Sequence, residues 1–572
     1  MPGDTFIGAR SPIPSHLALL ARRTAACGEI AVSTFVRTPC EDSLARLQPA
    51  TAPVVARTGA WVLTATILGS SLSFIDGTAV NVALPIMQRE LRATAADVQW
   101  VVEAYALFLA ALILVGGSLG DRLGRKRVFA TGIALFTAAS VVCGLAPSLI
   151  ILDIARAVQG VGGALLVPGS LAIISAAFDE ERRGAAIGTW SALTTITSAA
   201  GPVLGGWLVQ SLSWRWIFFI NVPLAAITLL VTARWVPESH GTVSGPLDLR
   251  GSALVTLGLG ALVFGLIESS SLGLGAPLVL ASLAVGVAAL VAFVIVEARS
   301  SAPMVPLSLF RSRTFAGTNL LTLFLYGALG GALYFLPFNL LQVQGYTPAE
   351  AGAALLPMTL IIFALSRWAG GLVRRVGARL PLVIGSAVAA AGFALFAVPG
   401  IGGSYWTTYF PAIVVLSLGM SLVIAPLTTT VMNSVGANRA GIASGVNNAV
   451  SRTAGLLAVA VLNLVVIAVF AHALATTLAT SPIDPALRRA LLAEASRLAN
   501  APIPSGTSPA DASLARHALD SAFVAGFRAA TLLGAALALG SSLVAATFLG
   551  GHISVATNPV PSGSPASASA SQ

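Results

Sequence analysis

Long apolar runs separated by short charged segments make up most of this sequence. Two such runs lie on either side of residues 117–127: residues 101–115 are apolar except for Glu103 and Tyr105, and residues 128–146 carry no charge. A helix needs about 20 mainly apolar residues to cross the hydrocarbon core of a bilayer, so each run indicates a membrane-spanning helix. Runs of this kind recur from Trp61 to Leu549. By the length rule they predict an all-α integral membrane protein with about fourteen spans.

Basic residues collect in every second connection between these runs. They lie at residues 122–127, 182–183, 311–313 and 374–379. Loops rich in Arg and Lys stay in the cytoplasm, so we expect these connections and both termini to be cytoplasmic. Residues 471–519 are more polar and form the long outer loop, in which Asp484 and Pro485 are placed to start a short helix. The pattern predicts a multi-pass protein of the plasma (inner) membrane of a bacterium.

Composition supports a membrane protein and excludes other classes. Of the 572 residues 56% are hydrophobic and only 9% are charged, and the mean hydropathy is +0.87. The net charge of +10 does not indicate nucleic-acid binding, because the basic residues are spread between apolar runs and do not form one patch. The three cysteines, Cys27, Cys40 and Cys143, predict neither a disulfide framework nor a metal site.

The sequence also argues against an enzyme. A membrane-embedded active site needs a convergent set of nucleophile, base or metal ligands. The histidines do not supply such a set, because all of them fall in tails or connecting segments: His16, His240, His472, His517 and His552. We therefore predict no catalytic residue, no metal and no cofactor.

The charged segment between the runs 101–115 and 128–146 has a spacing of its own. It reads Gly-Ser-Leu-Gly-Asp-Arg-Leu-Gly-Arg-Lys-Arg over residues 117–127. This order resembles the signature between helices 2 and 3 of the major facilitator superfamily, and the resemblance implies a secondary transporter. A generic basic loop would explain the arginines but not Asp121 or the glycine spacing. The resemblance implies that Asp121 pairs with Arg125 as a latch that holds one access state, in a gating hinge made of Gly117, Gly120, Asp121, Arg122, Gly124 and Arg125.

Asp76 lies inside the first apolar run. An aspartate in hydrocarbon costs about 2.5 to 3.5 kcal/mol on insertion scales, so it requires a partner or a use. Residues 75–85, Ile-Asp-Gly-Thr-Ala-Val-Asn-Val-Ala-Leu-Pro, resemble the first-helix motif of the fourteen-helix drug:proton antiporter family. We expect Asp76 to carry the coupling proton. The alternative is structural: Asp76 bonds to Thr78 or to a neighbouring helix and does nothing more.

Two more charged positions are candidates for proton coupling. Glu103 is either an interfacial carboxylate in water or a second acid that faces the transport pathway, and the sequence does not decide between them. Arg156 opens the pattern Arg-x-x-Gln-Gly-x-Gly, which matches the fourth-helix pattern of the superfamily. The family usually has a neutral residue where Asp153 stands. Because Asp153 and Arg156 fall on one helix face, Arg156 either neutralises Asp153 or tunes Asp76.

The fifth run contains a cluster of glycines around a proline. Gly201, Pro202, Gly205 and Gly206 predict a kinked helix that packs closely against a neighbour. The cluster resembles the antiporter signature of the superfamily, found mainly in exporters, which implies outward transport. The alternative is a generic packing site, because such clusters occur in many membrane helices.

The second part of the chain repeats and extends this plan. Residues 368–379 echo the basic hinge without its aspartate, as expected for two halves that descend from one repeat. Two extra spans between the halves favour the fourteen-helix branch. The predicted organisation is a disordered tail (1–57), an N-terminal six-helix half (58–237), two inserted membrane helices (245–298), a C-terminal six-helix half (312–549) and a disordered C-terminal tail (550–572).

These features together predict a major facilitator fold and a proton-coupled exporter of small amphipathic or hydrophobic molecules such as drugs or antibiotics. A proton-coupled importer or metabolite transporter of the same superfamily is the alternative. The expected partners are the cargo, protons and the lipid bilayer, and the protein is expected to be a monomer. Aromatic and polar residues of the ninth span are candidates for contact with the cargo: Tyr326, Tyr334, Phe335 and Asn339.

Overall fold

The computed structural model describes residues 56–241, 247–300, 303–435 and 440–550, and these residues form helices and connections without any strand. The predicted all-α fold is therefore confirmed. The first described helix begins at Ala56, two residues inside the predicted N-terminal tail. The rest of both predicted tails, with Cys27, Cys40, His16 and His552, lies outside the described residues.

The described residues contain thirteen helices long and apolar enough to cross a membrane, and one shorter apolar helix, Arg379–Leu395. The short helix has 17 residues, which is the lower limit for a membrane span. Thirteen long helices and this short one agree with the predicted number of about fourteen spans.

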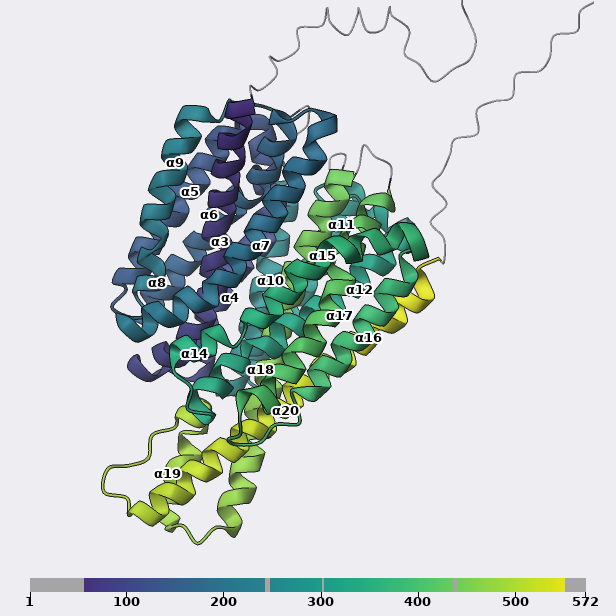
Figure 1. Cartoon of the computed structure of the whole chain (residues 1–572). Coiled ribbons are helices and arrows are strands. Elements are labelled where there is room, and N and C mark those ends of the chain that lie inside the picture. The colour runs from purple at the N-terminus through teal and green to yellow at the C-terminus, as the bar shows by residue number, and fades with distance from the viewer. Residues whose placement is uncertain (1–55, 242–246, 301–302, 436–439, 551–572) are drawn as a thin grey trace, which may run out of the picture. The chain divides into compact units, whose positions relative to one another are not determined.

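The first six spans lie side by side in the purple-to-blue part of Figure 1. The second of them begins with a capping box, in which Thr94 and Asp97 satisfy each other's backbone N–H groups. It ends at Gly124, whose φ of 107° reverses the chain at low steric cost. The helices are α3 (Ala56–Glu90), α4 (Ala95–Leu123), α5 (Arg125–Leu145), α6 (Leu149–Ala177), α7 (Glu180–Ser211), and α8 (Trp216–Phe219) with α9 (Asn221–Trp235).

Glycines allow α6 to approach α4 and α5 at backbone distance. A Cβ atom at Gly160 would lie 2.5 Å from the Tyr105 carbonyl oxygen, and one at Gly162 would lie 2.6 Å from the Phe136 nitrogen. These glycines of the Arg-x-x-Gln-Gly-x-Gly pattern are therefore packing positions, as close membrane helices require.

The two inserted membrane helices and the helices of the second half come next in the chain and are coloured teal to yellow in Figure 1. Gly377 has a φ of 77° between two helices of the second half, like Gly124 in the first, which agrees with the predicted repeat. The helices are α10 (Leu249–Leu272), α11 (Pro277–Arg299), α12 (Arg313–Tyr334), α13 (Leu336–Phe338), a π-helical turn (Asn339–Val343), α14 (Pro348–Ala353), α15 (Leu356–Val376), α16 (Arg379–Leu395), α17 (Tyr405–Asn433), α18 (Ala440–Thr480), α19 (Pro485–Ala493) and α20 (Pro509–Phe548).

The predicted outer loop 471–519 is largely helical. Helices α18 and α20 have 41 and 40 residues. At 1.5 Å per residue each is about 60 Å long, roughly twice the hydrocarbon thickness, so both extend beyond a bilayer. Their ends are joined by α19, which starts at Pro485 behind an Asp484 cap as predicted, and by a 3₁₀ segment, Ala495–Asn500.

Candidate functional site

Asp76 lies near the middle of α3 and forms an ion pair with Arg156 of α6. The Asp76 side chain is fully buried, and its Oδ2 atom lies 2.5 Å from Arg156 Nη1. Arg156 Nε also donates to the Val101 carbonyl oxygen of α4 at 2.8 Å. The guanidinium carbon lies 4.4 Å from the centre of the Tyr105 ring, within cation–π distance. The pair therefore links α3, α4 and α6.

Neutral side chains satisfy the second oxygen of the Asp76 carboxylate. Gln159 Nε2 donates to Oδ1 at 2.8 Å, and Asn221 Nδ2 of α9 donates to the same atom at 3.3 Å. Ser140 Oγ of α5 accepts from both amides, at 2.8 and 3.2 Å. All of these side chains are buried. The result is a buried network in which both oxygens of the Asp76 carboxylate have partners inside the helix bundle.

The network decides between the two partners considered for Arg156 and excludes one of the two partners considered for Asp76. Arg156 pairs with Asp76 and not with Asp153, because its long side chain reaches across to α3 while Asp153 Oδ1 has no hydrogen-bond partner among the described residues. Asp76 does not bond to Thr78, whose hydroxyl donates to the carbonyl oxygens of Phe74, Ile75 and Ser198. Asp76 does bond to a neighbouring helix, as the structural alternative also expects.

Sequence reasoning assigned no role to Gln159, Ser140, Asn221 or Tyr105. The available signal was polar residues inside otherwise apolar runs, because a buried polar group requires a partner. That signal does not identify the partner, since the contacts of Asp76 join residues far apart in the chain, as for the 83-residue separation of Asp76 and Gln159.

Glu103 is buried, with 1% of its surface exposed, which excludes the interpretation as an interfacial carboxylate in water. Its Oε1 atom accepts one long hydrogen bond, 3.4 Å from Gln99 Nε2, and its Oε2 atom has no partner among the described residues. Gln99 Oε1 in turn accepts a hydrogen bond from Asn463 Nδ2 of α18. Glu103 thus lies where α4 meets the second half.

The four predicted cargo contacts fall in different surroundings. Tyr334 and Phe335 are buried, and their ring centres are 5.0 Å apart. Asn339 is held within the second half, because it donates to the Tyr409 hydroxyl and accepts from Gln344, both at 3.2 Å. Tyr326 is partly buried in the same apolar core. The hydroxyl oxygen of Tyr334 is buried and lacks a hydrogen-bond partner among the described residues.

The predicted hinge contains the predicted ion pair. Arg125 Nη2 lies 2.8 Å from Asp121 Oδ1, and Arg125 Nη1 donates to the Ala172 carbonyl oxygen of α6 at 3.3 Å. The glycines behave differently from each other. Gly124 supplies the positive φ of the turn, whereas Gly117 and Gly120 have only ordinary van der Waals neighbours, at 3.6 and 3.9 Å from an added Cβ. Close approach of α4 to α6 occurs instead at Gly116, against the Ala164 carbonyl.

Glu238 holds the hinge from the segment after α9. Its carboxylate accepts from the backbone N–H groups of Lys126 and Arg127, at 2.9 and 3.3 Å, at the first turn of α5. The Arg125 N–H donates to the Ser239 carbonyl oxygen at 2.8 Å. An acid at a helix N-terminus is favourable because the first N–H groups have no partner within the helix. Sequence analysis missed Glu238. The available signal was its position just after the sixth span, which places this acid on the same side of the membrane as the predicted basic loop.

The glycine–proline cluster of α7 packs against both halves. Gly201 lies against Thr78 and Gly205 against Ala79, both on α3. Gly206 lies against the Pro348 carbonyl of α14, and Gly352 of α14 lies against the Pro202 carbonyl, so neither glycine leaves room for a Cβ atom. The close packing predicted for this cluster is therefore present, and part of it joins the first half to the second.

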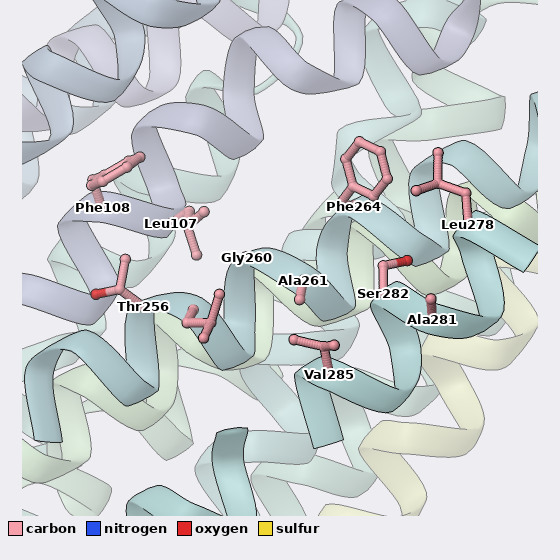
Figure 2. A pocket seen from close by; sticks show the side chains of 11 residues that line it. Leu107, Phe108, Thr256, Gly260, Ala261, Phe264, Leu278, Ala281, Ser282 and Val285 are labelled. Carbon is pink, nitrogen blue, oxygen red and sulfur yellow. The ribbon is translucent and has the colours of Figure 1, made fainter. Parts of the chain in front are cut away.

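An apolar groove lies between α4 and the inserted helices α10 and α11. Figure 2 shows Leu107 and Phe108 of α4 facing residues of α10 and α11 such as Phe264 and Val285. The cavity volume is about 470 Å³, and Thr256 and Ser282 supply its polar side chains. No sequence-predicted site residue lines it.

Arg452 is a further charged residue within an apolar run, and it lies on α18. Its Nε atom has no hydrogen-bond partner among the described residues.

Residues 66–459 of this chain match the Major Facilitator Superfamily. The chain is 36% identical over 441 residues to the Multidrug resistance protein Stp of Mycobacterium tuberculosis, and the alignment covers 76% of this chain and 81% of that protein. It is 35% identical to the Tetracenomycin C resistance and export protein of Streptomyces glaucescens, over 70% of this chain and 74% of that protein. It is 37% identical to the Puromycin resistance protein pur8 of Streptomyces alboniger, over 71% of this chain and 81% of that protein.

Solved structures agree on the fold. A bacterial homolog of the human lysosomal transporter Spinster, in an inward-facing and unoccupied conformation, gives a TM-score of 0.56 at 18% identity and covers 86% of this chain and 99% of its own. An auto-inhibited POT family peptide transporter gives 0.56 at 16% identity, with coverages of 86% and 96%. At such identities the likeness supports the helical architecture alone.

Proposed function

This chain belongs to the Major Facilitator Superfamily, and we propose that it is a proton-coupled exporter (antiporter) of small amphipathic or hydrophobic molecules such as drugs or antibiotics. Relatives at 35 to 37% identity are named for multidrug resistance, for tetracenomycin C export and for puromycin resistance. The observation that carries the proposal is the buried Asp76–Arg156 pair, because a titratable acid held inside a membrane bundle is what proton coupling requires.

Asp76 is the proposed coupling acid and Arg156 its switchable partner. When Asp76 is ionised, Arg156 binds it through a charge-assisted hydrogen bond, roughly twice as strong as a neutral one. Protonation removes the negative charge and weakens this contact, while Arg156 keeps its bond to the Val101 carbonyl oxygen. The proton thereby changes how firmly α3 is held to α6 and α4, which favours a different arrangement of these helices.

The contacts between the two halves support a state closed on the outer side. In the described residues, the hydrogen bonds that cross between the halves lie at the helix ends opposite the hinge: Gln342 to Gln88 at 2.9 Å, Gln88 to the Arg497 carbonyl at 3.2 Å, the Ala349 N–H to Gln210 at 3.2 Å, and Asn463 to Gln99. We place the hinge in the cytoplasm because its loop is basic, and both termini with it. Export then requires these outer contacts to open and the Asp121–Arg125 latch to rearrange.

Everted membrane vesicles from bacteria that express the chain provide the test. A proton gradient, acid inside, should drive a fluorescent drug into these vesicles, and a protonophore should release it. Vesicles without the protein are the control. Accumulation only under the reversed gradient would favour the importer, and a drug flux unaffected by the protonophore would refute proton coupling.

A further inference from the structure

A pair of acidic side chains lies where the first inserted helix begins and the second one ends. Asp248 caps the first turn of α10, because its Oδ1 atom accepts from the Gly251 N–H at 2.8 Å. Glu297 lies in the last turn of α11, and only 2% of its surface is exposed. Its Oε2 atom accepts from the Val305 N–H at 3.2 Å. The two acids therefore lie where both inserted helices meet the segment that leads into α12.

The other oxygen of each carboxyl group has no hydrogen-bond partner among the described residues. These two atoms, Asp248 Oδ2 and Glu297 Oε1, are both buried. They face the same glycine, because an added Cβ atom at Gly251 would lie 2.4 Å from the first and 3.1 Å from the second. The two carboxyl groups are close enough to form a hydrogen bond with each other. Ionised carboxylates only accept hydrogen bonds, so this contact requires a proton between them.

Basic side chains do not neutralise the two acids within the described part of the chain. The ion pairs found there involve neither Asp248 nor Glu297. Arg250 and Arg299, the basic residues of α10 and α11 nearest to them in sequence, are exposed. A divalent metal is a poor match, because it prefers six or more oxygen ligands and the described residues contain no group of three or more candidate ligand residues. A shared proton satisfies both unpaired oxygens and removes the repulsion between two adjacent carboxylates.

We propose that Asp248 and Glu297 share one proton at neutral pH, and that this protonated pair is a pH-sensitive clasp at the cytoplasmic end of the inserted helices. The clasp lies on the same side of the membrane as the hinge, because α10 begins shortly after Glu238, and its cytoplasmic placement rests on the orientation proposed for the hinge. A rise in cytoplasmic pH removes the proton and leaves two like charges in a buried place. Their repulsion loosens the start of α10 from the end of α11.

The clasp predicts how stability depends on pH. Carboxyl groups of an unfolded chain ionise near about pH 4. Above that pH the folded pair holds one proton more than the unfolded chain does, so the pair makes stability fall as the pH rises, until the proton is lost. Glu297→Gln removes this dependence, because its amide does not ionise and can donate to Asp248 Oδ2 as the protonated acid does.

Thermal unfolding of the purified full-length protein in detergent measures this dependence. Between about pH 6 and about pH 9 the unfolding midpoint should fall less for Glu297→Gln than for the wild type. At the higher pH the midpoint of the variant should exceed that of the wild type by about 1 to 2 °C. Asp248→Asn should behave like Glu297→Gln, because asparagine also caps a helix and its amide does not ionise.

Two further variants distinguish the clasp from packing and from a general loss of charge. Glu297→Ala has no donor for Asp248 Oδ2 and should be less stable than Glu297→Gln at every pH. The matched control is Glu268→Gln near the other end of α10, where the carboxylate accepts from Trp100 Nε1 at 3.4 Å. This control should keep the pH dependence of the wild type. A Glu297→Gln variant with that same dependence would overturn the clasp.

Infrared spectroscopy detects the shared proton directly, because a protonated carboxyl group has a C=O stretching band that a carboxylate lacks. The spectrum of the wild type minus that of Glu297→Gln should contain one such band at neutral pH, and the band should vanish at alkaline pH. Its absence at neutral pH would mean that both acids are ionised and would overturn the inference. Neither measurement involves transport. A clasp that behaves as expected in a protein without gradient-driven export would support this inference and refute the exporter, and export without the band would do the reverse.

Discussion

The Arg156 guanidinium of α6 holds the Asp76 carboxylate of α3 at 2.5 Å inside the first half of the protein. Both side chains are almost completely buried, with exposed fractions of 1% and 0%, so neither charge is compensated by water. The two residues thus form one electrostatic unit, and a change in the protonation of Asp76 acts on Arg156 directly.

The first prediction concerns the proton itself. Asp76→Asn keeps a side chain of similar shape that Gln159 and Asn221 can still contact, but it cannot take up or release a proton. We expect gradient-driven export to be lost while downhill exchange of drug across the membrane persists. Both are measured in vesicles, with and without the proton gradient. Undiminished uphill transport by Asp76→Asn would place the coupling proton elsewhere, with Glu103 as the next candidate.

The second prediction separates stability from coupling. Arg156→Ala leaves the Asp76 carboxylate buried without a counter-charge, a change that costs about 3 to 5 kcal/mol in buried pairs. The thermal unfolding midpoint in detergent should fall clearly. The double variant Asp76→Asn with Arg156→Gln removes both charges, so it should recover much of that stability and still fail to couple. A double variant as unstable as Arg156→Ala would show that packing, and not charge, explains the loss.

The sequence predicted the fold well because each membrane span is encoded locally. Twenty apolar residues and a flanking basic loop suffice to place a helix, and Gly124 and the Asp121–Arg125 spacing suffice to place the hinge. The network around Asp76 could not be predicted in the same way. Its members, Ser140, Gln159 and Asn221, come from three other helices, and only tertiary packing decides that they meet.

Asp153 shows the limit of helix periodicity. It shares a helix face with Arg156, and that spacing made Asp153 one of two possible partners of Arg156. A long arginine side chain has several partners within reach, however, and the structure gives it Asp76, Gln159 and the Val101 carbonyl. Glu103 shows the same limit for depth, because the sequence did not decide whether its carboxylate lies in water at the interface or faces the transport pathway.

The third prediction concerns the hinge. Asp121→Asn removes the charge-assisted contact with Arg125, worth about 1.5 to 3 kcal/mol, and should reduce transport while the protein still reaches the membrane. Glu238→Gln weakens the cap on α5 and should act in the same direction. Membrane yield by immunoblot and export by the vesicle assay are the two measurements. Arg299→Gln, at the end of an inserted helix, is the control, and normal export by both hinge variants would reduce the hinge to a topological signal.

The last prediction concerns the glycines that join the halves. A Cβ atom at Gly206 would collide with the Pro348 carbonyl, and one at Gly352 would collide with the Pro202 carbonyl, and in both cases the obstacle is backbone that cannot rotate away. Gly206→Ala and Gly352→Ala should therefore force α7 and α14 apart and open the outer side. We expect a raised proton leak in liposomes without drug, together with reduced export. Gly188→Ala is a matched control on the same helix, because an added Cβ there has no neighbour within 4 Å among the described residues. If Gly206→Ala leaked no more than Gly188→Ala, the α7–α14 contact would not be the seal, and the polar contacts of Gln88, Gln342 and Asn463 would have to close the outer side instead.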